Sequence, residues 1–141
     1  MALLDKIKFH VWNPLTAVLD LVEKWNPTDC TTEKDYERSL YEWLHEQLGG
    51  VQVTKQFARG RVHADLVVAD KVIIELKVNL DTTAKYQRLV GQLEEYREWK
   101  GDVVIVLFGR TDKNLRKKLD EAVEKRSGFL PFDQQLRVVQ K

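Results

Sequence analysis

The segment VHADLVVADKVIIELKV, residues 62–78, restricts the fold more than any other part of the chain. Two apolar stretches rich in β-branched residues, 62–68 and 71–78, are separated by only two residues, which is typical of an antiparallel β-hairpin. A buried strand carries charged side chains only for a structural or chemical reason. Three ionisable residues nevertheless interrupt this apolar pattern: Asp65, Glu75 and Lys77.

The apolar pattern selects one register for this hairpin. We consider the register in which Val68 pairs with Val72 around a three-residue loop. Asp65 then lies opposite Glu75, whereas a shift of one residue would place Asp65 among apolar side chains. In the selected register one face of the hairpin is entirely apolar and carries Leu66, Val68, Val72, Ile74, Leu76 and Val78.

The other face of the hairpin gathers ionisable side chains. Asp65 and Glu75 lie there with Lys77, and His63 is expected opposite Lys77. Ionised groups on a sheet that helices cover are costly unless they are paired, solvated or bound to a cation. Two carboxylates that converge from adjacent strands offer the hard oxygen ligands that Mg²⁺ and Mn²⁺ prefer. The hairpin therefore predicts a divalent-metal site.

Helices and further strands flank the hairpin in the sequence. Apolar residues at helical spacing, with capping signals, predict helices over residues 14–25, 32–48, 83–100 and 111–126. Additional strands are predicted over residues 51–58 and 103–108, and the tail 129–141 is expected to add an edge strand. A three-stranded meander between helices, followed by another strand, predicts an α/β fold with a central mixed sheet flanked by helices.

This arrangement resembles the PD-(D/E)XK nuclease superfamily, which has the restriction-endonuclease-like fold. Asp65 is followed after nine residues by ELK at 75–77, similar to the core motif of that family, although Ala64 replaces the proline of its name. The αβββαβ core of the family is similar to residues 32–108 here. The resemblance implies a nuclease domain over residues 31–141, with residues 1–30 as an N-terminal helical extension of a single compact domain.

Residues on the flanking helices extend the resemblance. Gln92 and Tyr96 resemble the Q-x-x-x-Y signature of the RecB-like and λ-exonuclease-like branch. Glu37 lies on the predicted helix before the meander, where many members carry a glutamate that reaches the metal directly or through water. The spacing of Gln92, Tyr96 and Arg88 places them on one helical face, which suits contact with a nucleic-acid backbone.

The resemblance implies a role for each candidate residue. The expected metal ligands for Mg²⁺ or Mn²⁺ are Asp65, Glu75, the backbone carbonyl of Leu76, and Glu37. The expected catalytic residues are Asp65, Glu75, Lys77 and Gln92. Lys77 is expected to orient or deprotonate the attacking water, or to stabilise phosphate charge. The expected nucleic-acid contacts are Tyr96, Arg88, Lys85, Arg59 and Arg61.

These residues predict a metal-dependent nuclease that hydrolyses phosphodiester bonds by metal-activated water, on DNA rather than RNA. The Gln/Tyr pair favours a RecB-like exonuclease in DNA repair, recombination or replication. Two alternatives stay open from the sequence. One is a homodimeric structure-specific endonuclease such as a Holliday junction resolvase, and the other is a non-catalytic nucleic-acid-binding member of the fold.

The composition limits where nucleic acid can bind. The 141 residues include 23 basic and 22 acidic ones, with a net charge of +1, so binding has to come from local clusters of charge. The chain length suits one compact domain. No membrane partner is expected, because the sequence has no apolar stretch long enough to cross a bilayer. One cysteine, Cys30, and the lack of a long apolar stretch or a secretion signal predict a cytoplasmic protein.

Overall fold

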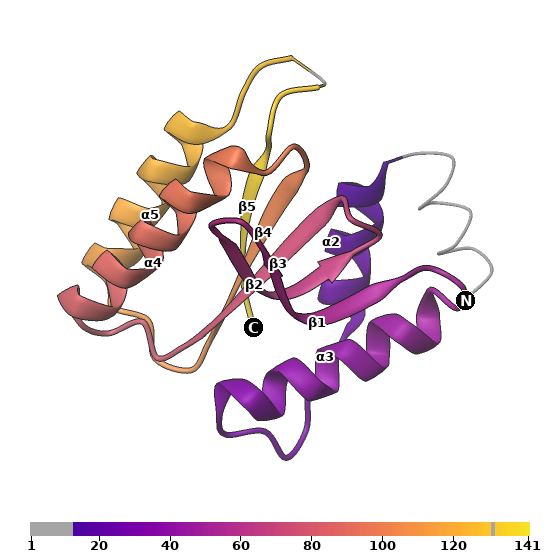
Figure 1. Ribbon diagram of the computed structural model, residues 1–141. Coiled ribbons are helices and arrows are strands. Elements are labelled where there is room, and N and C mark those ends of the chain that lie inside the picture. The colour runs from indigo at the N-terminus through magenta and orange to yellow at the C-terminus, as the bar shows by residue number, and fades with distance from the viewer. Residues whose placement is uncertain (1–12, 131) are drawn as a thin grey trace.

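A five-stranded mixed sheet forms the centre of the fold (Figure 1). The computed structural model describes residues 13–130 and 132–141. The strands lie side by side in sequence order: β1 (Val53–Arg59), β2 (Val62–Val68), β3 (Val72–Val78), β4 (Asp102–Phe108) and β5 (Leu136–Gln140). β1, β2 and β3 pair antiparallel, and β4 and β5 continue the sheet in parallel from β3. The predicted C-terminal edge strand is therefore confirmed.

Two helices cover each face of this sheet (Figure 1). One face packs against α2 (Pro14–Lys24) and α3 (Glu33–Gln47). The other face packs against α4 (Thr83–Glu95), the 3₁₀ turn η2 (Tyr96–Glu98) and α5 (Lys113–Arg126). The structure is thus an α/β fold with a mixed sheet between two layers of helices.

The first two described helices begin at the caps that the sequence predicts. The Asn13 side chain accepts hydrogen bonds from the backbone N–H groups at the start of α2, and Pro14 occupies the first helical position. Thr32 and Asp35 form a capping box at the start of α3. Side chains of α2 are buried in the same core as the sheet, while residues 1–12 of the predicted extension lie outside the described residues.

The register of the β2–β3 hairpin is the predicted one. Leu66 pairs with Ile74, Val67 with Ile73, and Val68 with Val72. The turn between the strands is tight because Ala69 and Asp70 both have a φ of 53°. The apolar face predicted for this hairpin packs against α2 and α3, and burial there segregates the ionisable side chains onto the opposite face.

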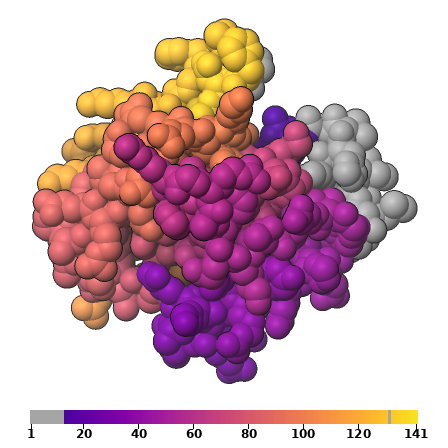
Figure 2. Space-filling model, in the orientation of Figure 1, coloured from indigo at the N-terminus to yellow at the C-terminus, as the bar shows by residue number. Residues whose placement is uncertain are grey.

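The β1–β2 hairpin bends at Gln56 and Asp65. These two residues lie between the pairs Lys55–Leu66 and Phe57–Ala64, and Gln56 has a φ of 49°. On one side of the bend Val53, Leu66 and Val68 pack towards α2 and α3. On the other side Phe57, Val62 and Ala64 pack towards α4 and α5. The outer half of the hairpin therefore crosses from one core to the other, and Figure 2 shows the hairpin between α4 on its left and α3 below it.

The bend ends the pairing between β2 and β3. The last paired residue of β2 before the bend is Leu66, so β2 leaves β3 at Asp65. The predicted pairing of His63 with Lys77 is wrong, because the bend carries His63 away from β3 and pairs it with Ala58 of β1.

The helix predicted over residues 83–100 is shorter than expected. α4 ends at Glu95 and is followed by the turn η2. Trp99 is buried, and its indole N–H donates to the Lys71 carbonyl at 3.2 Å. This tertiary contact stops the helix before β4. In the described part of the chain, no helix is both long and apolar enough to cross a membrane.

Candidate active site

Asp65, Glu75 and Lys77 meet on the α4 side of the sheet, and we refer to them as the acid–lysine cluster. The Lys77 ammonium lies 3.6 Å from the Glu75 carboxylate. Asp65 accepts a hydrogen bond from the backbone N–H of Leu76 at 2.8 Å, so its side chain continues the contact with β3 after the ladder has ended. The Glu75 side chain is 2% exposed and that of Lys77 is 15% exposed. The cluster is therefore largely withdrawn from water.

Burial changes the protonation of the two carboxyl groups. Burial, followed by the charge of Asp65, raises the pKa of Glu75 to about 8. Burial also raises the pKa of Asp65, although the hydrogen bond from Leu76 opposes this effect. Lys77 lowers the pKa of both acids, but at 3.6 Å from Glu75 it does not offset their burial. Without a cation the pair therefore retains a proton near neutral pH.

The Tyr96 hydroxyl holds Glu75 in place. It lies 2.5 Å from a Glu75 carboxyl oxygen and 2.7 Å from the His63 carbonyl oxygen. Burial, and then the charge of Glu75, raises the pKa of Tyr96, so the hydroxyl keeps its single proton. The hydroxyl has one proton to donate, so it shares that proton between the Glu75 carboxyl oxygen and the His63 carbonyl oxygen. The predicted role of Tyr96 as a nucleic-acid contact is wrong because its side chain is fully buried.

Gln92 carries a buried oxygen that has no hydrogen-bond partner among the described residues. It lies on α4 one helical turn before Tyr96. Buried side-chain oxygens usually have a partner, and those without one often serve a bound ion, water or ligand. Gln92 thus adds an unpaired amide oxygen, able to accept a hydrogen bond or bind a cation, to the helix that supports the acid–lysine cluster.

Replacing Gln92 with methionine is expected to raise the free energy of unfolding by about 1 kcal/mol without divalent metal, because it removes a buried acceptor that lacks a partner. Urea denaturation would measure the change. Gln87→Met, at an exposed position on the same helix, is the control and should change stability by less than about 0.5 kcal/mol. A loss of stability in Gln92→Met alone would show that the amide is already satisfied.

Glu37, a predicted metal ligand, lies near the cluster but bonds elsewhere. Its carboxylate accepts a hydrogen bond from the Gln56 side chain at 2.6 Å, and its charge acts on Asp65. In residues 13–130 and 132–141, no three His, Cys, Asp or Glu side chains are grouped closely enough to hold a metal ion. The chain here presents two converging carboxylates, which suits Mg²⁺ because that ion keeps several waters. The Leu76 carbonyl and Glu37 stay predicted ligands.

The predicted basic residues divide into two groups. Lys85 and Arg88 line a cavity of about 110 Å³ together with Lys77. Arg59 and Arg61 lie at the turn between β1 and β2, where Arg59 is 3.5 Å from the Asp70 carboxylate. The structure thus brings the two α4 residues to Lys77 and places the hairpin arginines on another part of the surface.

Two residues beside the cluster were not predicted from the sequence. Gln56 occupies the bend position across from Asp65 and binds Glu37. Glu33 lines the cavity next to Lys77 and accepts a hydrogen bond from the Val78 N–H at 3.2 Å. The capping box at Thr32 is the sequence signal that could have identified the position of Glu33, because it places Glu33 in the first turn of α3.

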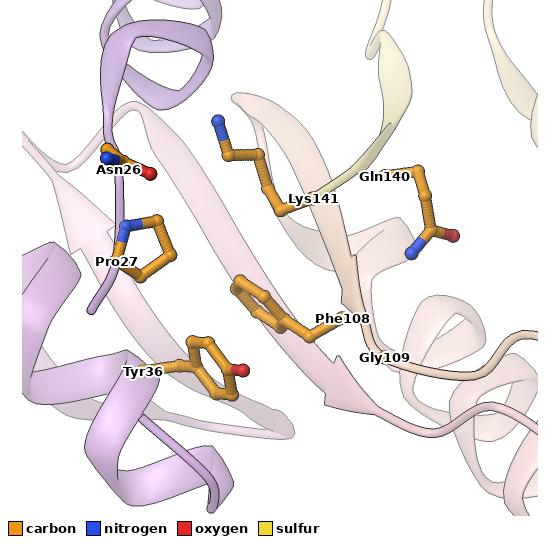
Figure 3. Close-up of a pocket in the computed structure, with 7 residues that line it drawn as sticks. All are labelled: Asn26, Pro27, Tyr36, Phe108, Gly109, Gln140 and Lys141. Atoms are coloured by element: carbon orange, nitrogen blue, oxygen red, sulfur yellow. The ribbon is translucent and has the colours of Figure 1, made fainter. Parts of the chain in front are cut away.

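A larger cavity of about 470 Å³ lies at the carboxyl ends of β4 and β5 (Figure 3). Its aromatic wall is Tyr36 stacked on Phe108, with ring centroids 3.9 Å apart. The other lining residues are Asn26, Pro27, Gly109, Gln140 and Lys141. This cavity contains no member of the acid–lysine cluster, so we do not assign the catalytic chemistry to it.

Comparison with known proteins identifies no relative. No family model matches the chain, and no curated protein or solved structure matches it. The function therefore has to be inferred from the geometry of the site itself.

Proposed function

We propose that the protein is a divalent-metal-dependent nuclease that hydrolyses phosphodiester bonds in DNA. The main support for this proposal is that Asp65, Glu75 and Lys77 lie together on one face of a largely apolar sheet. Burying two carboxyl groups together raises the pKa of each and costs stability, and a bound cation would offset that cost. A site of this kind is better explained by metal binding than by stabilisation of the fold.

The proposed roles follow from the positions of the side chains. Asp65 and Glu75 hold Mg²⁺ or Mn²⁺, with the Leu76 carbonyl as a further ligand. The metal supplies Lewis-acid activation of a water and neutralises charge on the phosphate. Lys77 lies beside Glu75 and either orients the water or contacts a phosphate oxygen. Tyr96 is a positioning residue that holds Glu75 through its hydroxyl.

The order of elements supports a restriction-endonuclease-like fold as part of this proposal. α3, the meander β1–β2–β3, α4 and β4 follow each other as αβββαβ, with Asp65 on β2 and Glu75 and Lys77 on β3. The resemblance to PD-(D/E)XK nucleases rests on the same residues. We infer a RecB-like activity from Gln92 and Tyr96: the Tyr96 hydroxyl binds Glu75, and Gln92, one helical turn earlier on α4, carries a buried oxygen without a partner among the described residues.

The proposal is tested by incubating the purified protein with end-labelled and internally labelled DNA in Mg²⁺, in Mn²⁺ and in EDTA. We expect cleavage only with metal, and a loss on the order of 100-fold or more in Asp65→Asn and Lys77→Ala. Lys118→Ala, at an exposed position on α5, is the matched control and should cleave at the wild-type rate.

The outcome of this assay separates the alternatives. Cleavage of linear but not circular DNA indicates an exonuclease, and cleavage of circles or four-way junctions indicates an endonuclease. Binding of DNA without metal-dependent cleavage of any DNA or RNA would contradict the proposal and indicate a non-catalytic binding module.

A further inference from the structure

The cavity next to Lys77 combines positive charge with a small volume. It measures about 110 Å³ and is lined by Glu33, Lys77, Val78, Leu80, Lys85 and Arg88. The lining therefore carries three cationic side chains and one carboxylate. A cavity of this size has room for a small oxyanion but not for a nucleoside. We call it the Lys77 cavity.

The three cations differ in how far they are already neutralised. The Lys85 ammonium contacts the Asp81 carboxylate and the Asn79 carbonyl, each at 3.0 Å. The Lys77 ammonium lies 3.6 Å from the Glu75 carboxyl group. Within the described part of the chain, Arg88 forms no hydrogen bond or ion pair. Arg88 therefore leaves a guanidinium at the cavity that is available to bind an oxyanion.

The Glu33 carboxylate occupies the place where such an oxyanion would bind. It accepts a hydrogen bond from the backbone N–H of Val78 at 3.2 Å, one residue beyond Lys77. A carboxylate oxygen and a phosphate oxygen accept the same kind of hydrogen bond from a backbone N–H. Glu33 is exposed and lies in the first turn of α3, so its side chain can turn outwards without unfolding the helix.

We propose that the Lys77 cavity binds one phosphate group of a nucleic-acid strand, and that Glu33 fills this phosphate position in the free protein. The anion-binding part stands on the cavity alone, whereas the nucleic-acid part rests on the proposed nuclease function. Glu33 is then a specificity-determining residue: the strand has to displace its carboxylate, which disfavours weak, non-specific anions.

The experiment titrates inorganic phosphate into the protein in EDTA and follows the Val78 amide resonance by NMR. We expect this resonance to shift as phosphate replaces Glu33. Glu33→Gln keeps an oxygen acceptor but removes the negative charge, and should bind phosphate about tenfold more tightly. Arg88→Gln should weaken binding about tenfold. Glu42→Gln makes the same charge change at an exposed position on α3 and should match the wild type.

A second arm uses a short single-stranded oligonucleotide under the same metal-free conditions. Glu33→Gln should tighten its binding, and Arg88→Gln should reduce the slope of log affinity against log salt by about 0.7, as expected for one lost phosphate contact. Because no cleavage is needed, a failed nuclease assay leaves both arms interpretable.

Three results would overturn the proposal. If phosphate does not shift the Val78 resonance in either the wild type or Glu33→Gln, the cavity does not bind anions. Equal phosphate affinity in the wild type and Glu33→Gln would remove the role of Glu33. If phosphate binds but Arg88→Gln does not change the salt slope of oligonucleotide binding, a nucleic-acid strand is not the ligand of this cavity.

Discussion

Replacing Glu75 with glutamine is expected to abolish metal-dependent cleavage while making the metal-free protein more stable at high pH. The neutral amide keeps the size of the side chain but is a poor ligand for a divalent cation. Replacing a group that merely supports a metal ligand typically costs 10- to 100-fold, so losing a ligand should cost on the order of 100-fold or more. Wild-type Glu75 must ionise at high pH inside a buried site, and the glutamine avoids this cost.

The stability gain of Glu75→Gln should reach roughly 3 kcal/mol at about pH 9 and vanish near pH 5, where the wild-type carboxyl is already neutral. Urea denaturation at both pH values, beside single-turnover cleavage in Mg²⁺, measures the two effects together. Glu42→Gln, at an exposed position on α3, should leave both unchanged. A Glu75→Gln variant that cleaves normally, or that is less stable at both pH values, would remove Glu75 from the metal site.

The second large effect is a fall in stability of the metal-free protein as the pH rises from about 5 to about 8. Folding raises the pKa of Glu75 from 4.5 to about 8, so the folded state binds more protons than the unfolded state across this window. The free energy of unfolding then decreases with pH, by about 1 kcal/mol per pH unit for one such group. The raised pKa of Asp65 acts in the same direction.

Other carboxyl groups act outside this window. Hydrogen bonds from the backbone of Thr32 and Thr31 lower the pKa of Asp35, so its contribution is present above its unfolded pKa and is lost only in acid. Stability should therefore be greatest near pH 5. Divalent metal should reverse the trend at higher pH, because it binds the ionised carboxylates and adds about 2.7 kcal/mol at 100 times its dissociation constant.

Denaturation curves at several pH values, each with EDTA or with Mg²⁺, measure this dependence. Glu75→Gln serves as the control, since it should flatten most of the metal-free slope between pH 5 and 8. A wild-type stability that rises across that window in EDTA would show that the two carboxyl groups are ionised and paired in the free protein, contrary to the proposed metal site.

The register of the central hairpin was predictable because its two faces differ in chemistry: one is entirely apolar, and the other carries Asp65, Glu75 and Lys77. Leu66, Ile74 and Leu76 are fully buried against α2 and α3, and a slip by one residue would place Asp65 or Glu75 in that apolar core, away from Lys77 and Tyr96. The same pattern brought Lys77 beside Glu75. Local signals were also sufficient for the helix starts, where Asn13 and Thr32 cap their helices through contacts within a few residues.

The bend at Gln56 was not predictable, because it depends on contacts between distant parts of the chain. The bend turns Phe57 towards Trp99, with ring centroids 5.5 Å apart, and brings His63 to Tyr96. Neither contact has a signal in the local sequence. The premature end of α4 has the same origin, since residues after Glu95 have ordinary helical propensity but are held by tertiary contacts.

The acids of α3 show a related difficulty. Four glutamates on that helix are similar in sequence context, and only the packed structure distinguishes Glu33, at Val78, from Glu37, at Gln56. The predicted metal role of Glu37 relied on helix position, but the direction of a side chain also depends on the strand that faces it. Here that strand is the bent part of β1.

The bend also separates the acid–lysine cluster from the tip of its own hairpin. Gly60 lies in the β1–β2 turn with a φ of 60°, and a Cβ added there would meet no atom within 4 Å, whereas Asp65 is tied to β3 through the backbone N–H of Leu76. Residues inserted at this turn would project into solvent and leave the anchoring bond undisturbed. Under the proposed nuclease function, lengthening this one short connection is therefore a route to changing target selectivity without disturbing the acid–lysine cluster.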